Sequence, residues 1–161
     1  MQTFLPDPDF LASARALDTK RLGKQRVETI QVLRGLTVAG YGWRHHPAVK
    51  MWHGYEEALV RYGLDMCAVW VDAGNADTCA DTLRADVRTT AGIEVIRSQQ
   101  ALGEAGHLPP WLGDPALHLS HRSALVRKDP AFYRPVFGDD VPDDLPYVWP
   151  ASDRPPTLVP S

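Results

Sequence analysis

The chain has 161 residues, of which 44% are hydrophobic and 23% are charged, and 17 basic and 20 acidic side chains give it a formal net charge of −3. This size and composition fit one globular domain. The acidic total counts against a protein that coats nucleic acid, but the charge is uneven. Residues 1–61 carry 9 basic and 6 acidic side chains, and residues 62–161 carry 8 and 14. A protein that is acidic overall can still present a basic face.

Several other classes of protein are disfavoured. No apolar run approaches the roughly 18 residues of a membrane-spanning helix. The first ten residues, MQTFLPDPDF, carry proline and aspartate where a signal peptide needs an apolar stretch. Cys67 and Cys79 match no common metal or redox spacing. We therefore expect a cytoplasmic protein that has no membrane partner and no cofactor, and the sequence leaves its oligomeric state open.

The predicted elements of the first half are helices separated by short breaks. The segment through Asp9 is interrupted by proline and is predicted to be irregular, and a short helix is expected over 10–17. Apolar residues at helical spacing predict a longer helix over 19–38. A long amphipathic helix is then predicted from Pro47 to about residue 73.

The second half continues in the same way. A helix is predicted over 77–90, residues 93–102 are ambiguous between strand and helix, and an Asp-Pro start predicts a helix over 115–128. The proline-rich tail, residues 142–161, is expected to wrap the surface in extended form or to fray. The prediction is a mainly α, compact single-domain fold over residues 1–141, followed by this tail.

One charged stripe lies on the predicted helix over 19–38. At about 100° per residue, Arg21, Lys24, Gln25 and Glu28 share one face of that helix. Lys24 and Glu28 are also spaced i,i+4, as in a helical ion pair. The simpler interpretation is a solvated face with a salt bridge, and the functional one is a face that contacts substrate.

Arg26 differs from these residues because its helical angle falls within the apolar stripe, between Leu22 and Ile30. A buried guanidinium needs a carboxylate, a phosphate or several carbonyl groups. A structural ion pair and a ligand-binding arginine are equally good interpretations.

A second cluster contains Arg44, His46, Lys50 and His53, and Glu57 stands four residues after His53. The histidines could cap and pack a helix. Alternatively, they could line a pocket for a substrate or an anion, with the two basic side chains beside it.

A third cluster, His118, His121 and Arg122, lies on the predicted helix over 115–128. Two imidazoles on an apolar face must find hydrogen-bonding partners. The two histidines could also hold a metal, but the chain has no HExxH-like signature. We therefore predict that these residues contact substrate, and we predict no metal site.

Tryptophans lie both in predicted helices and in loops. Trp52 and Trp70 occupy apolar helix positions and are expected in the core. Trp43, Trp111 and Trp149 lie in loop-like segments near the charged clusters. A loop tryptophan beside arginine could stack on a nucleobase, or it could pack onto the core as a lid.

Three stretches of the chain resemble a known family. They are LDTKRLGKQRVE, HPAVKMWHGYEEALVRYGLDMCAVWVDAG and HLSHRSALVRKDPAFYRPVFG. Together they are similar to the pyrimidine-dimer DNA glycosylases of the phage endonuclease V type, and most of all to uncharacterised bacterial members of that family. The resemblance implies a compact helical domain that binds DNA, flips a damaged base and cleaves its glycosidic bond.

The resemblance also implies a mechanism. The family uses the N-terminal α-amine to form a Schiff base with the sugar, a glutamate assists, and elimination then cuts the strand. Carried over to this chain, the catalytic residues are Met1, Arg26 and Glu28. Arg26 matches the active-site arginine of the family. Val27 stands where the family has its glutamate, and Glu28 follows one residue later.

The sequence therefore predicts a DNA-repair-type glycosylase, with or without AP-lyase activity. The residues expected to bind substrate are Arg21, Lys24, Gln25, Arg44, His46, Lys50, His53, His118, His121 and Arg122. A second hypothesis keeps the fold but assigns it a small nucleotide-like or anionic ligand in a His/Arg/Glu pocket, with or without a metal. A third is a non-catalytic interaction module whose proline-rich tail docks a partner.

Overall fold

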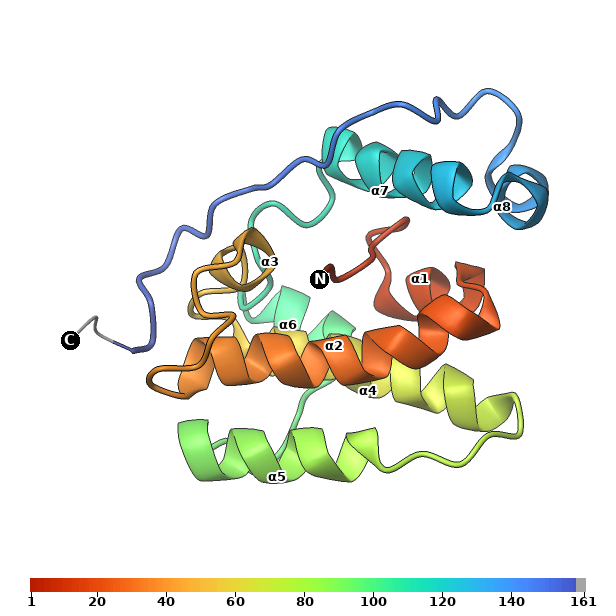
Figure 1. The fold of residues 1–161 in the computed structure, drawn as a ribbon. Coiled ribbons are helices and arrows are strands. Elements are labelled where there is room, and N and C mark those ends of the chain that lie inside the picture. The colour runs from red at the N-terminus through yellow and green to blue at the C-terminus, as the bar shows by residue number, and fades with distance from the viewer. Residues whose placement is uncertain (159–161) are drawn as a thin grey trace.

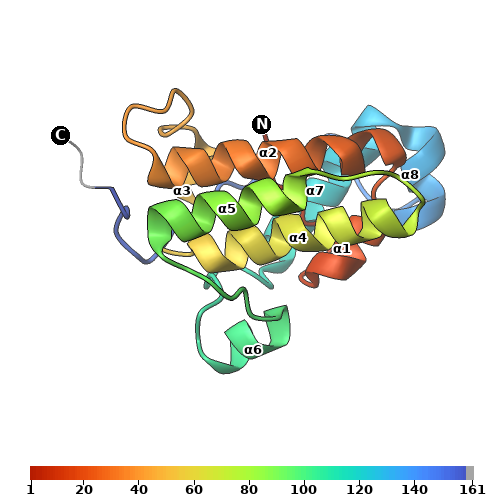
Figure 2. The same cartoon turned by 90° about the horizontal axis from the view of Figure 1, so that it is seen from below.

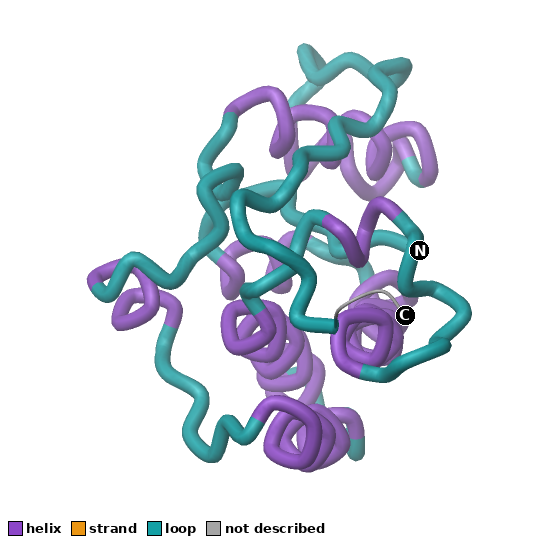
Figure 3. Tube along the Cα trace, turned by 90° about the vertical axis from the view of Figure 1, so that its left-hand side faces the viewer, coloured by secondary structure: helices purple, strands orange, loops and turns teal. Residues whose placement is uncertain are grey.

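The fold consists of helices joined by long irregular segments. The computed structural model describes residues 1–158 and has eight helices and no strand within that range. Figure 3, which looks nearly along the axes of the long helices, shows only helix and loop. The predicted mainly α class is confirmed. No helix among these residues is both long enough and apolar enough to span a membrane.

The lower layer in Figure 1 contains four helices: α1 (Phe10–Ala16), α2 (Thr19–Thr37), α4 (Glu56–Asp72) and α5 (Cys79–Ala91). Helices α2, α4 and α5 pack against one another, and α1 packs against α4. Figure 2 shows the three long helices side by side from below. The apolar side chains that the helical spacing predicted, such as Leu33 on α2, are buried between them.

The upper layer contains α7 (Pro115–Lys128) and α8 (Pro130–Phe137), which pack against each other (Figure 1). Two short helices, α3 (Pro47–Lys50) and α6 (Gln99–Glu104), complete the fold. As predicted, α7 starts at an Asp-Pro pair, and the Asp114 carboxylate accepts a hydrogen bond from the Ala116 N–H. Such a cap satisfies one of the free N–H groups at a helix start.

The first nine residues, here called the leader, lie between the two layers (Figure 1). The leader has no regular structure before α1, as predicted, yet residues 2–6 are all buried. A buried irregular backbone must find hydrogen-bond partners outside helices and strands. Side chains of α2 and α7 supply these partners, so the position of the N-terminus is determined by tertiary contacts.

Two helix predictions need correction. The predicted helix from Pro47 to residue 73 is divided into α3 and α4, because Gly54 adopts a positive φ of 80°. A Cβ at that position would lie 2.6 Å from Cβ of Arg154, so the side chain of Arg154 in the tail occupies the space. Helix α8 was missed, although its Asp129-Pro130 start repeats the signal that begins α7.

The segment left ambiguous, residues 93–102, is extended at first and becomes helical at Gln99. The tail takes the predicted extended course through residue 158, and residues 159–161 lie outside the described part. It runs along α7, where the N–H groups of Leu145 and Val148 donate to the hydroxyls of Ser123 and Ser120. The division at residue 141 stays a prediction.

Candidate functional site

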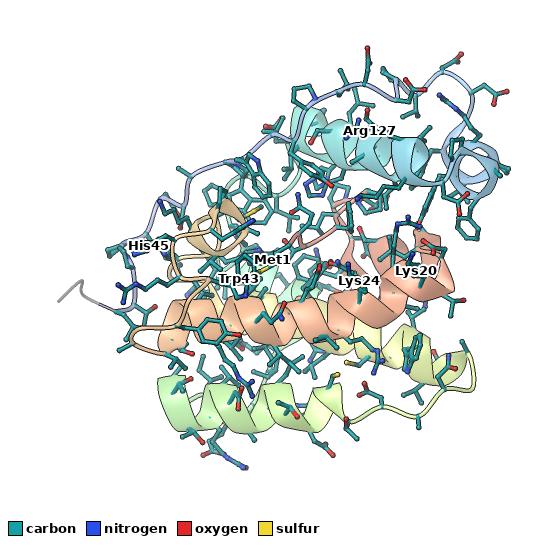
Figure 4. All side chains as sticks on the ribbon, viewed as in Figure 1. Met1, Lys20, Lys24, Trp43, His45 and Arg127 are labelled. Atoms are coloured by element: carbon teal, nitrogen blue, oxygen red, sulfur yellow. The ribbon has the colours of Figure 1, made fainter. Side chains whose placement is uncertain are left out.

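A cavity of about 340 Å³ lies where the leader passes between α2 and the tail. Met1, Gln2 and Phe4 of the leader line it, and Lys128 at the end of α7 and Tyr147 of the tail complete its wall. Figure 4 shows Met1 on the side of α2 that faces α7. Segments from both ends of the chain therefore form one site.

Helix α2 contributes the charged stripe that the sequence predicted. Arg21, Lys24, Gln25 and Glu28 all line the cavity, together with Lys20, which the sequence analysis missed. Figure 4 shows that Lys20 and Lys24 lie on the same side of α2 as Met1. The signal for Lys20 was its i,i+4 spacing from Lys24, which places both side chains on one face.

The Glu28 carboxylate is held in place by two neighbours on its own helix. Gln25 donates from Nε2 to Glu28 Oε2 at 2.9 Å, and Lys24 Nζ lies 3.8 Å from Glu28 Oε1. Gln25 is buried, whereas the Lys24 side chain is 66% exposed. The amide therefore orients the carboxylate, and the lysine ammonium remains free to contact a ligand.

The cavity is strongly cationic although the whole chain is acidic. Its wall carries four basic side chains, Lys20, Arg21, Lys24 and Lys128, and a single carboxylate, Glu28. Arg21 is partly neutralised by Asp18, whose Oδ1 lies 3.1 Å from its Nη1. Such a concentration of positive charge in a concave site attracts phosphates and other anions.

Two histidines of α7 hold the leader at Leu5. His118 Nδ1 donates to the Leu5 carbonyl at 2.7 Å, and His121 Nδ1 accepts from the Leu5 N–H at 2.8 Å. Burial lowers the pKa of His121 to about 3, with a further contribution from His118, so the ring is neutral and can accept at Nδ1. Both histidines are buried and bind the leader backbone, and their predicted contact with substrate stays a prediction.

Arg122 and Gln25 hold the residues on either side of Leu5. Arg122 donates to the Pro6 carbonyl at 2.7 Å, and Gln25 Oε1 accepts from the Phe4 N–H at 2.9 Å. Arg122, also predicted to contact substrate, therefore anchors the leader instead. Because these bonds fix consecutive residues of the leader, they determine where Met1 lies.

His46 lies close enough to the N-terminal amine and Glu28 to be affected by their charges. It caps α3 by accepting the Ala48 N–H at Nδ1, and its ring packs edge-on to Trp43 and Trp149 at centroid distances of 5.7 and 5.8 Å. Partial burial lowers the pKa of His46, the charge of the N-terminal amine lowers it further, and the Glu28 carboxylate opposes both. The amine and the carboxylate thus both act on this ring.

The loop tryptophans separate into two groups. Trp43 is 46% exposed and Trp149 is 38% exposed. Trp111 is buried, and its Nε1 donates to the Met51 carbonyl, so it packs as part of the core. The stacking interpretation therefore remains for Trp43 and Trp149 alone.

Three residues of the second cluster do not line the cavity. Arg44 is exposed and donates to its neighbour His45, and Lys50 is exposed at the end of α3. Partial burial lowers the pKa of His53, and its carbonyl accepts from the hydroxyl of Ser152 in the tail. None of the three is among the residues that line the cavity, and their predicted contact with substrate stays a prediction.

Arg26 lies on the opposite side of α2. It forms an ion pair with Asp77 at the start of α5, and its guanidinium lies 4.1 Å from the centroid of the Trp70 ring. Arg26 precedes Glu28 by two positions, so the two side chains project about 160° apart around the helix axis. Of the two interpretations of this residue, the buried ion pair is the one found. The predicted placement beside Met1 and Glu28 is corrected.

Residues that the sequence analysis missed come mostly from distant parts of the chain. Gln2, Phe4, Lys128 and Tyr147 carried no motif, because tertiary packing alone brings them together. Within residues 1–158, no three His, Cys, Asp or Glu side chains are arranged to hold a metal ion.

One of three comparisons with known proteins gave a match. A family model described as Pyrimidine dimer DNA glycosylase matches residues 1–83, which include the leader, α2 and α4. No curated protein and no solved structure gave a match. Because the matched residues make up just over half of the 161, the chain belongs to the pyrimidine dimer DNA glycosylase family.

Proposed function

We propose that this protein is a DNA glycosylase in which the Met1 α-amine displaces a damaged base and Glu28 assists. The observation that carries the proposal is that Met1 and Glu28 line the same cavity, together with four basic side chains. Family membership supports a DNA glycosylase-type function, with DNA as the substrate. The anchored leader supports a fixed position for the amine.

In the first step, the lone pair of the amine forms a bond to C1′ of the damaged nucleotide. The C1′–N bond breaks, and the base leaves with its electron pair and takes up a proton. The attached nitrogen then loses a proton, and its lone pair forms the C1′=N bond while the C1′–O4′ bond breaks. O4′ takes up a proton, and a protonated Schiff base links the protein to C1′. A carboxylate placed like that of Glu28 stabilises the positive charge that develops at the sugar.

In the second step, which constitutes the AP-lyase activity, a proton is removed from C2′. Its electron pair forms the C2′–C3′ double bond, and the C3′–O bond breaks to release the 3′ phosphate. Glu28 is the carboxylate at the cavity that can accept this proton. Hydrolysis of the Schiff base then frees the amine.

The remaining features of the site support binding of a DNA strand. Lys20, Lys24 and Lys128 supply positive charge for phosphates. The exposed rings of Trp43 and Trp149 are suited to contact with unpaired bases. Arg21, and not Arg26, provides the guanidinium that faces the cavity.

Borohydride trapping tests the proposal. Wild-type protein incubated with DNA that contains an abasic site or a pyrimidine dimer should give a covalent adduct after reduction. Tryptic mapping then locates the adduct, since the N-terminal peptide ends at Arg15 and is separate from the peptides that contain Lys20 and Lys24. We expect the adduct on Met1, and absence of any adduct would contradict the Schiff-base mechanism.

Matched variants sharpen this test. Glu28→Gln should lower the trapping rate on abasic DNA by about 100-fold or more, which is the usual range for a proton-transfer residue. Glu94→Gln, the same exchange at an exposed glutamate outside the cavity, is the control and should react like the wild type. An adduct on a lysine would support Schiff-base chemistry but would show that Met1 is not the nucleophile.

The alternative, a small nucleotide-like or anionic ligand, is favoured by one observation. The cavity volume of about 340 Å³ falls within the range of about 300–1,000 Å³ that is usual for ligand pockets. A mononucleotide that raises the melting temperature by several degrees, in a protein that gives no adduct with abasic DNA, would support this second function.

A further inference from the structure

Gln2 is one of the residues that line the cavity, and its side chain is buried. Gln2 is 4% exposed, and its Oε1 accepts a hydrogen bond from the Thr3 N–H at 2.9 Å. Its Nε2 has no hydrogen-bond partner among residues 1–158. Since the Thr3 N–H needs an acceptor, it determines which end of the amide carries the oxygen. The end without a partner is therefore a donor.

A buried donor without a partner costs about 1–3 kcal/mol, so its presence needs an explanation. Two other buried side-chain donors in residues 1–158 lack partners, Arg26 Nε and His121 Nε2. Neither of those residues lines the cavity, whereas Gln2 does. A ligand in the cavity would supply the acceptor that the protein does not.

The position of Gln2 limits which substrate atom it can reach. Gln2 follows Met1, so the two Cα atoms are about 3.8 Å apart. A side chain so close to an amine that attacks C1′ reaches the part of the base nearest to C1′. In a pyrimidine that part carries the carbonyl oxygen O2, which is two bonds from the N1 atom attached to C1′ and is a hydrogen-bond acceptor.

The chemistry of the cavity favours a base carbonyl over a phosphate. The lysines of α2 and α7 already provide charged donors for phosphates, and the Gln2 amide is neutral. It lies in a wall that also contains the rings of Phe4 and Tyr147, whose centroids are 6.4 Å apart. Aromatic rings beside a neutral donor suit a planar heterocycle with a carbonyl group.

We propose that Gln2 Nε2 donates a hydrogen bond to O2 of the pyrimidine that leaves and thereby stabilises it as a leaving group. When the C1′–N1 bond breaks, its electron pair moves onto the base and is shared between N1 and O2 until the base takes up a proton. A donor already aimed at O2 stabilises that charge without reorganisation. This inference rests on the proposed glycosylase function.

The test compares two substrates in the full-length chain. Gln2→Leu removes the donor, and Gln2→Glu keeps an acceptor for the Thr3 N–H while replacing the donor with a carboxylate. We expect single-turnover base release from DNA with a pyrimidine dimer to fall by about 100-fold in each variant. Borohydride trapping on a preformed abasic site, which has no leaving base, should stay within twofold of the wild type.

The control is Gln100→Leu, the same exchange at an exposed glutamine of α6, which should not change either reaction. Intact mass and melting temperature verify that each variant keeps Met1 and its fold. Equal losses on both substrates would show that Gln2 only supports the structure, and unchanged base release would also overturn the proposal. If the wild type traps no abasic DNA, it is the proposed function that fails, and the inference fails with it.

A second readout depends on leaving-group ability. With single uracil and 5-fluorouracil nucleotides as test bases, the fluorinated base leaves more easily and needs less stabilisation. The loss caused by Gln2→Leu should therefore be smaller for 5-fluorouracil than for uracil. Equal losses for the two bases would contradict a hydrogen bond to the departing O2.

Discussion

The two ends of the chain are both irregular and interrupted by proline, yet they are attached to the helices in opposite ways. Residues 2–6 of the leader are all buried, whereas no residue of the tail between 142 and 158 is. The leader is held by buried side chains of α2 and α7, and the tail lies across the outside of α7 and reaches α4 (Figure 1). Both ends nevertheless contribute to the same cavity.

This difference determines what each end can do. Water cannot replace the hydrogen bonds of a buried backbone, so loss of one leader contact leaves an unsatisfied group. The exposed backbone of the tail can bond to water instead. We conclude that the leader fixes the position of the N-terminus and that the tail forms one wall of the cavity.

The largest expected effect is on covalent trapping of abasic DNA, and it follows from displacing the N-terminal amine. Two residues placed before Met1 would displace the α-amine by several ångströms from Glu28, because each residue extends the chain by about 3.3–3.6 Å. Borohydride trapping on abasic DNA should then fall by at least 100-fold. The same two residues added after Ser161 serve as the control. Equal trapping by both proteins would show that the reaction does not depend on the position of the N-terminal amine.

The next largest effect is expected at the anchor of the leader. His121→Ala removes a fully buried ring and leaves the Leu5 N–H without its acceptor, which should lower the free energy of unfolding by about 3 kcal/mol. Urea denaturation measures the loss. A loss below about 1 kcal/mol would show that the leader is not held more firmly than the tail.

The same histidine predicts a pH dependence. Its pKa of about 3 in the folded protein lies below the value of about 6.5 in an unfolded chain. The unfolded state therefore binds more protons between these values, and stability is present above pH 6.5 and is lost as the pH falls towards 3. His121→Gln, which keeps a polar side chain, should flatten the curve of unfolding free energy against pH in this window.

Removal of residues 142–161 should have a smaller effect on stability. The tail contributes exposed contacts, so we expect the protein to remain folded with a melting temperature lowered by several degrees, equivalent to about 1–2 kcal/mol. Loss of Tyr147 opens the cavity wall and should weaken DNA binding. Unfolding of the truncated chain at room temperature would contradict the expectation that the tail contributes less to stability than the leader.

The smallest effect on stability is expected for Arg127→Ala. Arg127, labelled in Figure 4, donates from the outside of α7 to the carbonyls of Asp143 and Leu145. Exposed hydrogen bonds of this kind contribute about 0.5–1.5 kcal/mol. Amide hydrogen exchange of Leu145 and Val148 should become faster, while exchange of Leu5 should not change. Faster exchange at Leu5 would show that the two ends are coupled.

The fold was largely predictable because most of its elements are encoded locally. The apolar spacing of α2 and the Asp-Pro start of α7 define these helices without reference to the rest of the chain. The break at Gly54 was not predictable, since the amphipathic pattern continues through it and the side chain that requires a glycine there, Arg154, comes from the tail.

Apart from Met1, which the family resemblance named, the candidate site was predictable only on α2. Helical spacing alone places Lys24 and Glu28 on one face, and both line the cavity. The same reasoning could not decide the role of Arg26, because its partner Asp77 lies on another element. His118 and His121 were singled out correctly as polar groups on an apolar face. Their partner is the backbone of Leu5, over a hundred positions earlier in the chain.

The uneven charge of the chain shows the same division. The sequence by itself determined that the basic excess lies in residues 1–61 and that α2 carries part of it on one face, because helical periodicity is a local property. Only the tertiary structure decided that this face meets Met1, Lys128 and Tyr147 in one cavity. Burial of the leader is the physical reason, because its backbone groups bond to α2 and α7 and thereby place the N-terminus between them.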